Sequence, residues 1–476
     1  MQLKIKPSGL AARMAVVVIL AQPAWLLAQL TPVPAQPRMG QPLAGLSETE
    51  LARFLAGRVD FDTDFVAADG LGPIFNNNSC GACHITPLGG SGDVTVTRFG
   101  TYIKDEFDPL EELGGSLLQS AAISPECMEV IPPGAYTALR ATNSTLGMGL
   151  VEAIPDAAIE AHELDPPGGF VSGRVHWVIP LEDDSPMPEP RAGRFGWKAQ
   201  VATALTFSGD AALNEMGLTN RLVPTENAPN GNEELLAQCD TIPDPEDGPD
   251  QNGLDFIDRV TDFQRFLAAP PQTPRAGMSG EALFMNVQCG DCHVPSFTTA
   301  DVETLEPALR NKVIKPYSDF LLHDMGLLGD GIVQGDASDR EMRTPSLWGL
   351  RIRDPLLHNA SVTGGTFADR VAAAIAAHNA FLSEAAASAG AYDALLPEQK
   401  AAVIAFLDSL GRAEFDHSGD NAVNLGDVAA LSVCVSGPMP AYNPDHACAV
   451  ADINQDDDVD LFDWASFQNA FAASAF

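Results

Sequence analysis

The spacing of apolar residues predicts where two helices lie in the second half of this chain. A helix is expected over residues 397–410, because Pro397 and Glu398 suit its start and Gly411 suits its end. The apolar positions between them form one stripe, made of Val403, Ile404, Phe406, Leu407 and Leu410. A second helix is expected around residues 280–284 (GEALF). Taken alone, such stripes predict only an ordinary packed core.

The first residues have the pattern of an export signal. Lys4, Lys6 and Arg13 precede an apolar run over residues 15–28, and a Pro-rich stretch follows it. We therefore expect a signal peptide at residues 1–28, a linker at 29–45, and a protein in the periplasm, outside the cell or on its surface. The alternative is a membrane anchor, but Gln22 and Pro23 interrupt the run and it is short for a bilayer span.

Length limits the number of domains, and charge limits the kinds of partner. The 476 residues exceed what one core usually supports, so two or three domains are expected. The 64 acidic side chains against 27 basic ones give a net charge of −37, which excludes nucleic acid as a partner. Such a surface could steer a cationic protein or bind divalent metal ions.

Two short motifs point to haem. Residues 80–84 (CGACH) and 289–293 (CGDCH) both spell C-x-x-C-H. Cysteines three residues apart share one helical face, so Cys80 with Cys83, and Cys289 with Cys292, can each reach the two vinyl groups of one porphyrin. The next residue, His84 or His293, would supply a nitrogen to the iron. A redox dithiol or half a zinc site explains a bare C-x-x-C, but two copies followed by His and preceded by an export signal predict two covalently bound haem c groups.

Several further stretches resemble the di-haem oxidoreductase/peroxidase family, whose members are related to bacterial di-haem cytochrome c peroxidases and MauG-type enzymes. The resemblance extends over about residues 61–411 and rests on residues 70–76 (GLGPIFN), 147–155 (GMGLVEAIP), 194–199 (RFGWKA), 322–326 (LHDMG) and 343–349 (RTPSLWG). It implies a mainly α fold with two cytochrome c-like domains and a loop-rich insertion. We place the first haem domain with its insertion at residues 46–271 and the second at 272–411.

The same resemblance implies two catalytic residues. Family peroxidases carry a tryptophan between the haems and an acidic residue followed by Met-Gly over the reactive iron, and Trp197 and Glu215 match these positions. A carboxylate in a partly dry pocket can take a proton from one peroxide oxygen and deliver it to the other. The structural alternatives are a solvated helix residue for Glu215 and a packed core residue for Trp197.

The sixth iron ligands are less clearly marked. Family peroxidases use a methionine directly before an HDG-type triplet, but residues 357–360 here are LHNA. Met325, His323 and His358 are the candidates, in that order, although a lone histidine is more often a satisfied polar residue than a ligand. Thioether ligation would raise the potential of the haem, whereas imidazole would not.

The other cysteines predict disulfides. Cys127 and Cys239 lie between the haem motifs, and outside the cytoplasm such a pair is more often bridged than free. Cys434 and Cys448 are expected to cross-link the C-terminal segment.

The last 65 residues contain eleven acidic side chains and one Arg, and they predict a separate calcium-binding module at residues 412–476. Positions 1, 3, 5, 7, 9 and 12 of an EF-hand-type loop are matched twice, by Asp416, Ser418, Asp420, Ala422, Asn424 and Asp427 and by Asp452, Asn454, Asp456, Asp458, Asp460 and Asp463. Asp at position 12 resembles dockerin type I repeats. About two Ca²⁺ ions and a cohesin-like or cell-surface partner are therefore expected; a solvated acidic face is the alternative.

Two function classes fit these features. The first is a di-haem enzyme that reduces peroxide or a related small oxidant at the haem held by His84, with electrons relayed by the other haem from a donor cytochrome or cupredoxin. The second is an electron carrier without peroxidase activity. The sequence favours the enzyme, because a carrier does not need the insertion that bears Trp197 and Glu215. MauG-type oxidation of a partner protein is a further alternative within the enzyme class.

Overall fold

The computed structural model describes residues 36–163, 171–271, 279–412, 425–435, 448, 451 and 458–473. The expected signal peptide at residues 1–28 lies outside these ranges. None of the described helices combines the length and apolar character that crossing a membrane requires.

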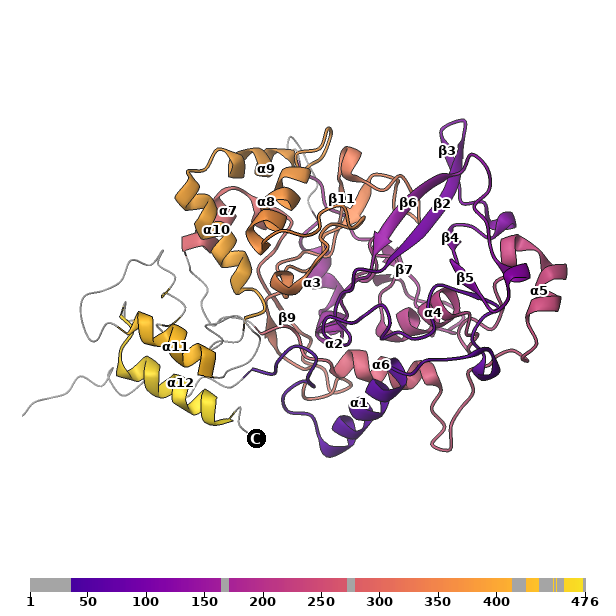
Figure 1. The fold of residues 1–476 in the computed structure, drawn as a ribbon, viewed down its shortest axis with the longest axis horizontal. Coiled ribbons are helices and arrows are strands. Elements are labelled where there is room, and N and C mark those ends of the chain that lie inside the picture. Colours follow the sequence, from indigo (N-terminus) through magenta and orange to yellow (C-terminus); the bar gives the residue numbers. More distant parts are fainter. Residues whose placement is uncertain are drawn as a thin grey trace, which may run out of the picture. The chain divides into compact units, whose positions relative to one another are not determined.

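Helices form most of the regular structure (Figure 1). Their bounds are α1 (Glu48–Phe61), α2 (Met148–Glu152), α3 (Asp156–Glu160), α4 (Ala204–Met216), α5 (Glu233–Cys239), α6 (Phe256–Phe266), α7 (Ser279–Asn286), α8 (Phe367–Ala377), α9 (Ala386–Asp393), α10 (Pro397–Ser409), α11 (Leu425–Cys434) and α12 (Leu461–Ala473). The expected helices at residues 280–284 and 397–410 are confirmed as α7 and α10. The mainly α character expected from the sequence is thus present.

A glycine brings α1 and α6 close together. A Cβ atom at Gly57 of α1 would lie 1.9 Å from the carbonyl oxygen of Arg259 in α6, so only glycine allows this approach. Beside it, the ring centroid of Phe263 lies 5.2 Å from that of Phe54 and 4.8 Å from that of Phe61. The helix that precedes the first cysteine motif is therefore packed against a helix almost 200 residues later.

A close helix–helix contact at a glycine is also found beside the second motif. A Cβ atom at Gly280 of α7 would lie 2.0 Å from the carbonyl oxygen of Ala402 in α10. The ring of Phe284 packs against Phe406, with 5.4 Å between centroids. Helices α7, α8, α9 and α10 gather in one group (Figure 1). Each cysteine motif thus follows a helix that crosses a later helix at a glycine.

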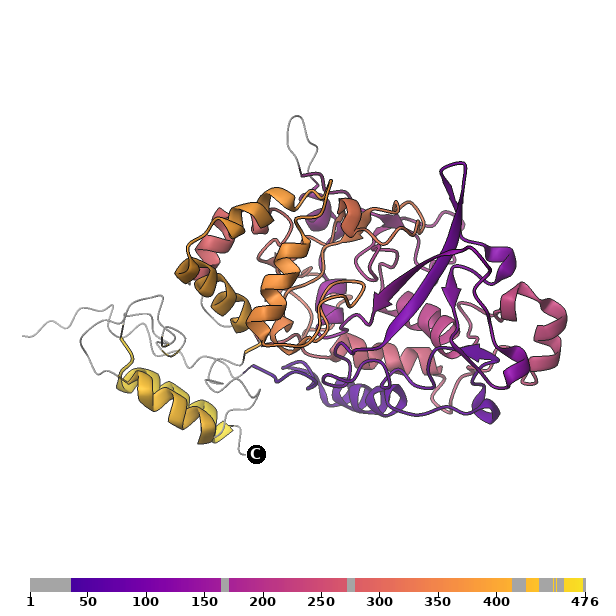
Figure 2. The ribbon, with the colours of Figure 1, turned by 45° about the horizontal axis from the view of Figure 1, so that its top comes forward.

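The region between the motifs, which the sequence predicted to be loop-rich, also contains strands. It contains an antiparallel four-stranded sheet in which β2 (Thr95–Ile103) pairs with β3 (Glu106–Asp108), β4 (Leu117–Leu118) and β6 (Tyr136–Ala141). Strands β2 and β6 run side by side (Figure 2), with Thr97 opposite Leu139 and Phe99 opposite Thr137. Their pairing joins residues about 40 positions apart, which local patterns do not reveal.

Short two-stranded pairings complete the described strands. They join β1 (Ile74–Phe75) to β5 (Ala121–Ala122), β7 (Trp177–Val178) to β8 (Arg191–Ala192), β9 (Phe297–Thr298) to β10 (Val313–Ile314), and β11 (Leu322–Asp324) to β12 (Glu341–Arg343). The expected Cys127–Cys239 disulfide is confirmed, with a Cα–Cα distance of 6.1 Å.

The apolar core is divided into clusters. The largest contains residues of α1, α4 and α6 together with Phe320 and Trp348, so residues beyond position 272 also contribute to it. A second cluster lies around α7, α8 and α10.

A third apolar cluster joins α11 and α12 through Leu431 and Phe467. The expected Cys434–Cys448 disulfide is confirmed in this part of the chain. The domain boundaries drawn from the sequence stay predictions.

Candidate haem-binding sites

The first motif forms one turn with a fixed histidine. The amide of His84 donates to the carbonyl of Cys80 at 3.1 Å, and Cys80 and Cys83 are not bridged. Nδ1 of His84 lies 3.0 Å from the carbonyl oxygen of Gly90. Because a carbonyl only accepts, Nδ1 carries the proton and the lone pair of Nε2 is left for a metal.

The second motif repeats this arrangement. Residues Cys289–Asp291 form a 3₁₀ turn, and the amide of His293 donates to the carbonyl of Cys289 at 2.9 Å. Nδ1 of His293 donates to the carbonyl of Tyr317 at 2.9 Å, so Nε2 is again available. Burial lowers the pKa of His293 to about 4, which keeps the imidazole neutral, as an iron ligand must be.

A largely apolar cavity of about 230 Å³ lies directly at the second motif. Its lining includes Cys289, Cys292 and His293 together with side chains of Phe284, Leu350, Leu356, Val371 and Leu407. Free thiols, an oriented imidazole and apolar walls are the features that a thioether-bound porphyrin needs. The residues present therefore fit haem c.

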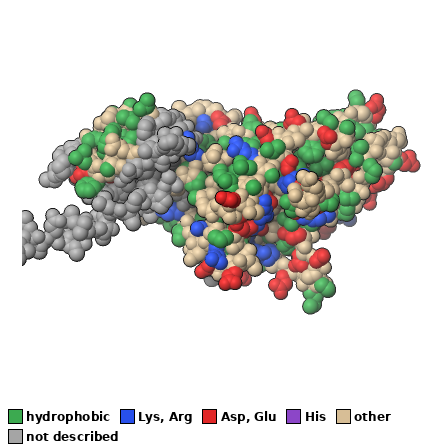
Figure 3. Space-filling model, turned by 90° about the horizontal axis from the view of Figure 1, so that it is seen from below, with side chains coloured by type: hydrophobic (Ala, Val, Ile, Leu, Met, Phe, Trp, Pro, Cys, Tyr) green, Lys and Arg blue, Asp and Glu red, His purple; other side chains and the backbone are tan. Residues whose placement is uncertain are grey.

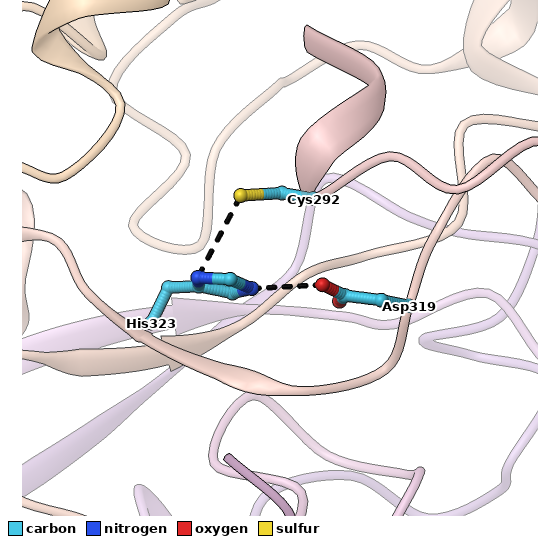
Figure 4. A group of neighbouring side chains, drawn as sticks. All are labelled: Cys292, Asp319 and His323. Atoms are coloured by element: carbon cyan, nitrogen blue, oxygen red, sulfur yellow. Dashed lines mark hydrogen bonds and ion pairs between the residues drawn. The ribbon is translucent and has the colours of Figure 1, made fainter. Parts of the chain in front are cut away.

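All three sequence-derived ligand candidates line this cavity: Met325, His323 and His358. His323, which is 2 % exposed, lies between Asp319 and Cys292 (Figure 4). Its Nε2 lies 2.8 Å from Oδ2 of Asp319 and its Nδ1 lies 3.2 Å from Oε2 of Glu384. Nδ1 also lies 3.6 Å from Sγ of Cys292.

These contacts decide the protonation of His323. Burial lowers its pKa, but the hydrogen bonds to Asp319, Cys292 and Glu384 outweigh burial and hold the pKa well above 6.5. Two carboxylate acceptors require both ring nitrogens to donate. The arrangement is that of a buried imidazolium beside the thiol of Cys292, with both ring nitrogens engaged.

His358 and Trp197 lie next to each other at the same cavity. Their ring centroids are 6.1 Å apart in an edge-on arrangement. Nε1 of Trp197 donates to the carbonyl of Ala141 at 2.8 Å, and the amide of Ala141 donates to the carbonyl of His358 at 2.6 Å. Burial lowers the pKa of His358 to about 4, so its imidazole is neutral.

Sequence reasoning did not select a fourth cavity residue, His378. Nδ1 of His378 donates to the carbonyl of Ala374 at 2.7 Å, which leaves Nε2 free. A usable signal was present: Val371, Ala374, Ile375 and His378 follow the i, i+3, i+4, i+7 spacing of one helix face, and all four line the cavity.

Glu215 lies at the first motif. It is in the last turn of α4, where its Oε2 accepts a hydrogen bond from Nδ2 of Asn76 at 2.9 Å. The amides of Asn76 and Asn77 both donate to its backbone carbonyl, and Nδ2 of Asn77 lies 3.6 Å from Sγ of Cys83. Burial raises the pKa of Glu215, against the hydrogen bond from Asn76. A carboxyl group of perturbed acidity thus stands beside the first thiol pair.

A buried ion triad holds the backbone next to Trp197. The carboxylate of Asp330 lies between two cations: Nε of Arg140 donates to its Oδ2 at 2.7 Å, and Nζ of Lys198 lies 2.9 Å from its Oδ1. All three side chains are at most 5 % exposed. Lys198 follows Trp197 and Arg140 precedes Ala141, so the triad fixes both partners of the indole hydrogen bond.

Part of the second predicted calcium loop is described. Carboxylate oxygens of Asp458, Asp460 and Asp463 lie within 4.8 Å of one another. Asp427 is buried in the first turn of α11. The remaining loop residues lie outside the described ranges: Asp416, Ser418, Asp420, Ala422, Asn424, Asp452, Asn454 and Asp456. Calcium binding in this tail stays a prediction.

Comparison with known proteins decides the family. Residues 36–100 and 134–410 match the profile described as "Di-haem oxidoreductase, putative peroxidase". The chain belongs to this family. It is therefore an oxidoreductase of the di-haem peroxidase type, with haem as its cofactor. The unmatched residues 101–133 contain strands β3 and β4, so this part of the sheet lies outside the family match.

A solved structure and the curated proteins complete the comparison. The structure, described as a MauG-like protein associated with microbial copper homeostasis, shares 16 % identity with this chain at a TM-score of 0.36. The match covers 79 % of this chain and 94 % of that one. No curated protein matches the sequence.

Proposed function

We propose that the protein reduces peroxide, or a related small oxidant, at a haem held by Cys80, Cys83 and His84, with electrons relayed through a second haem held by Cys289, Cys292 and His293. Haem iron supplies the site where the oxidant binds and is reduced. The observation that carries the proposal is the partly buried carboxyl group of Glu215 beside the first thiol pair. Two cytochrome c-like domains are inferred from the glycine crossing that precedes each motif.

The role of Glu215 is to move one proton. Asn76 fixes Oε2, and burial raises the pKa of the carboxyl group, so it holds a proton more readily than an exposed glutamate does. We infer that it takes the proton of one peroxide oxygen and returns it to the departing oxygen.

Trp197 is inferred to connect the two haem sites electronically. Its indole is fixed by the hydrogen bond to Ala141 and lies against His358 at the second cavity. This ordered position supports the role that family resemblance gives to it.

Met325, His358 and His378 are the groups that we propose as sixth ligands of the second haem. His323 is less suited, because both of its ring nitrogens already contact carboxylates. Neutral imidazoles at His358 and His378 are compatible with iron binding. Near-infrared magnetic circular dichroism separates methionine from bis-histidine ligation.

Export and partners remain proposals as well. We infer an exported protein from the N-terminal pattern and a cationic donor cytochrome or cupredoxin from the net charge of −37. Acidic side chains recur over the face in Figure 3, with basic ones among them. The helices α11 and α12, joined by their own apolar core, are compatible with a dockerin-like calcium module that docks to a cohesin-like or cell-surface partner.

Peroxide turnover with a matched variant tests the function. The haem-loaded protein is examined by electron paramagnetic resonance as isolated and half-reduced, and then with peroxide. Glu215→Gln should slow turnover and leave haem content unchanged, whereas Glu160→Gln, on the exposed face of α3, should change neither. Two low-spin irons that do not react with peroxide in either state would favour the electron-carrier function. Oxidation of a partner protein without peroxide turnover would favour MauG-type chemistry.

A further inference from the structure

Three carboxylates outside the haem sites meet in the segment that follows α4. Oxygen atoms of Glu226, Asp244 and Glu246 lie within 4.8 Å of one another. The hydroxyl of Thr219 lies 3.1 Å from Oδ1 of Asp244 and also contacts Oε2 of Glu246. The cluster brings together residues on both sides of α5.

Two oxygens of this cluster are buried without a hydrogen-bond partner. The side chain of Glu226 is only 7 % exposed; its Oε1 accepts from the amide of Asn227 at 2.9 Å, but Oε2 has no donor. Oε1 of Glu246 is likewise buried without a donor. Among the described residues, no Lys or Arg forms an ion pair with these carboxylates. Leaving such acceptors unsatisfied costs free energy, so something is expected to bind them.

Burial of Glu226 also changes its acidity. Burial raises its pKa to about 9, and the neighbouring charges of Glu246, Asp244 and Asp240 add to this, although the amide of Asn227 opposes it. The pKa of Glu246 is raised as well, again first by burial.

We propose that Glu226, Asp244 and Glu246 bind one Ca²⁺ ion. All the available ligand atoms are oxygens, which excludes soft metals and favours hard dications. Three carboxylates carried by irregular segments suit the variable geometry of Ca²⁺ better than the strict octahedron of Mg²⁺. The exposed Asp244 leaves one side of the site open to water, which can complete the coordination.

The ion would stabilise the two segments that carry the first haem site, which are the end of α4 and the loop before Cys80. Thr219, whose amide donates to Oε2 of Glu246 at 2.9 Å, comes three residues after Met216, the last residue of α4. A Cβ atom at Gly70 would lie 2.6 Å from Cβ of Glu246, so the same side chain packs on the segment that leads to Cys80. Binding of Ca²⁺ therefore links the end of α4, which bears Glu215, to the loop before the first motif.

Metal stoichiometry tests this site independently of enzyme activity. The haem-loaded full chain is titrated with Ca²⁺ against a chromophoric chelator, as wild type, Glu226→Gln, Asp244→Asn and Glu234→Gln. Glu234 is exposed on α5 and serves as the control. The C-terminal loops are the same in every variant, so differences report this site alone. We expect Glu226→Gln to lose one ion, Asp244→Asn to bind that ion at least tenfold more weakly, and the control to match wild type.

Several results would overturn the proposal. Equal stoichiometry and affinity in wild type and Asp244→Asn would do so, even if Glu226→Gln failed to fold. Loss of a proton-binding group without loss of an ion would show a carboxylic acid pair instead of a metal site. Tighter binding of Mg²⁺ than of Ca²⁺ would refute the assignment of the ion. Because the readout is ion binding, the outcome does not depend on whether the protein reduces peroxide.

Discussion

Replacing Asp330 by Asn should destabilise the protein strongly, because this carboxylate neutralises two buried cations. Its side chain is 1 % exposed, and those of Arg140 and Lys198 are 5 % and 0 % exposed. Asn keeps the size but removes the charge, so both buried cations would lose their counter-charge. They would keep only neutral acceptors, which are Gln334 for Arg140 and the carbonyls of Ser338 and Glu341 for Lys198. Removing one partner of a buried ion pair typically costs about 3–5 kcal/mol. For a cooperative unit of this kind the midpoint should fall by on the order of 10 °C.

Thermal and urea unfolding of the haem-loaded protein, followed by far-ultraviolet circular dichroism, measure this loss. Asp336→Asn is the control, because Asp336 is exposed and lies only six residues away. A loss of less than about 1 kcal/mol, which is typical of a surface pair, would refute the buried-triad interpretation.

The pH dependence gives a second check on the same prediction. Burial raises the pKa of Asp330, but the charges of Arg140 and Lys198 outweigh burial and hold it below 3.8. A carboxyl group with a lowered folded-state pKa stabilises the protein above its unfolded pKa, and this contribution is lost as the pH falls through the folded value. The stability difference between wild type and Asp330→Asn should therefore be full at neutral pH and shrink only in acid below 3.8.

Three further changes have defined outcomes. Glu215→Gln should reduce the rate of peroxide turnover by about 10²–10⁴-fold, since it removes the proton-transferring group; an unchanged rate in stopped-flow assays would exclude that role. Replacing Cys127 and Cys239 by Ser should lower the free energy of unfolding by about 2–5 kcal/mol, because the bridge closes a loop with a sequence separation of 112; urea midpoints equal to wild type would contradict this. Asp463→Asn should weaken Ca²⁺ binding to the C-terminal module, and calorimetric titration that shows wild-type affinity would argue against the calcium loop.

The sequence predicted the elements whose pattern is local. The apolar stripe before Gly411 forms α10. The two disulfides are also present, but they were expected from the export signal and not from a local pattern. The sheet of β2 and β6 was missed, because its register depends on pairing between residues about 40 positions apart, such as Thr97 with Leu139.

The candidate site shows the same limit. Glu215 was selected by family resemblance and lies beside the first motif, with Asn76 as its partner. The acidic surroundings of His323 depend on Glu384, which is 61 residues away, so no local pattern could show that both ring nitrogens are engaged. The cluster at Glu226 was missed because acidic residues are frequent in this chain, and only the folded structure separates buried carboxylates from solvated ones.

The central claim is that two haems are bonded to the cysteine pairs, and intact mass spectrometry of the purified, exported protein tests it most directly. We predict the mature polypeptide plus two haem groups that survive extraction with acidified acetone, with a Soret band to match. Substituting Cys289 and Cys292 by Ala should remove one haem and leave the other. A mass equal to the bare polypeptide, with no Soret band, would contradict the claim.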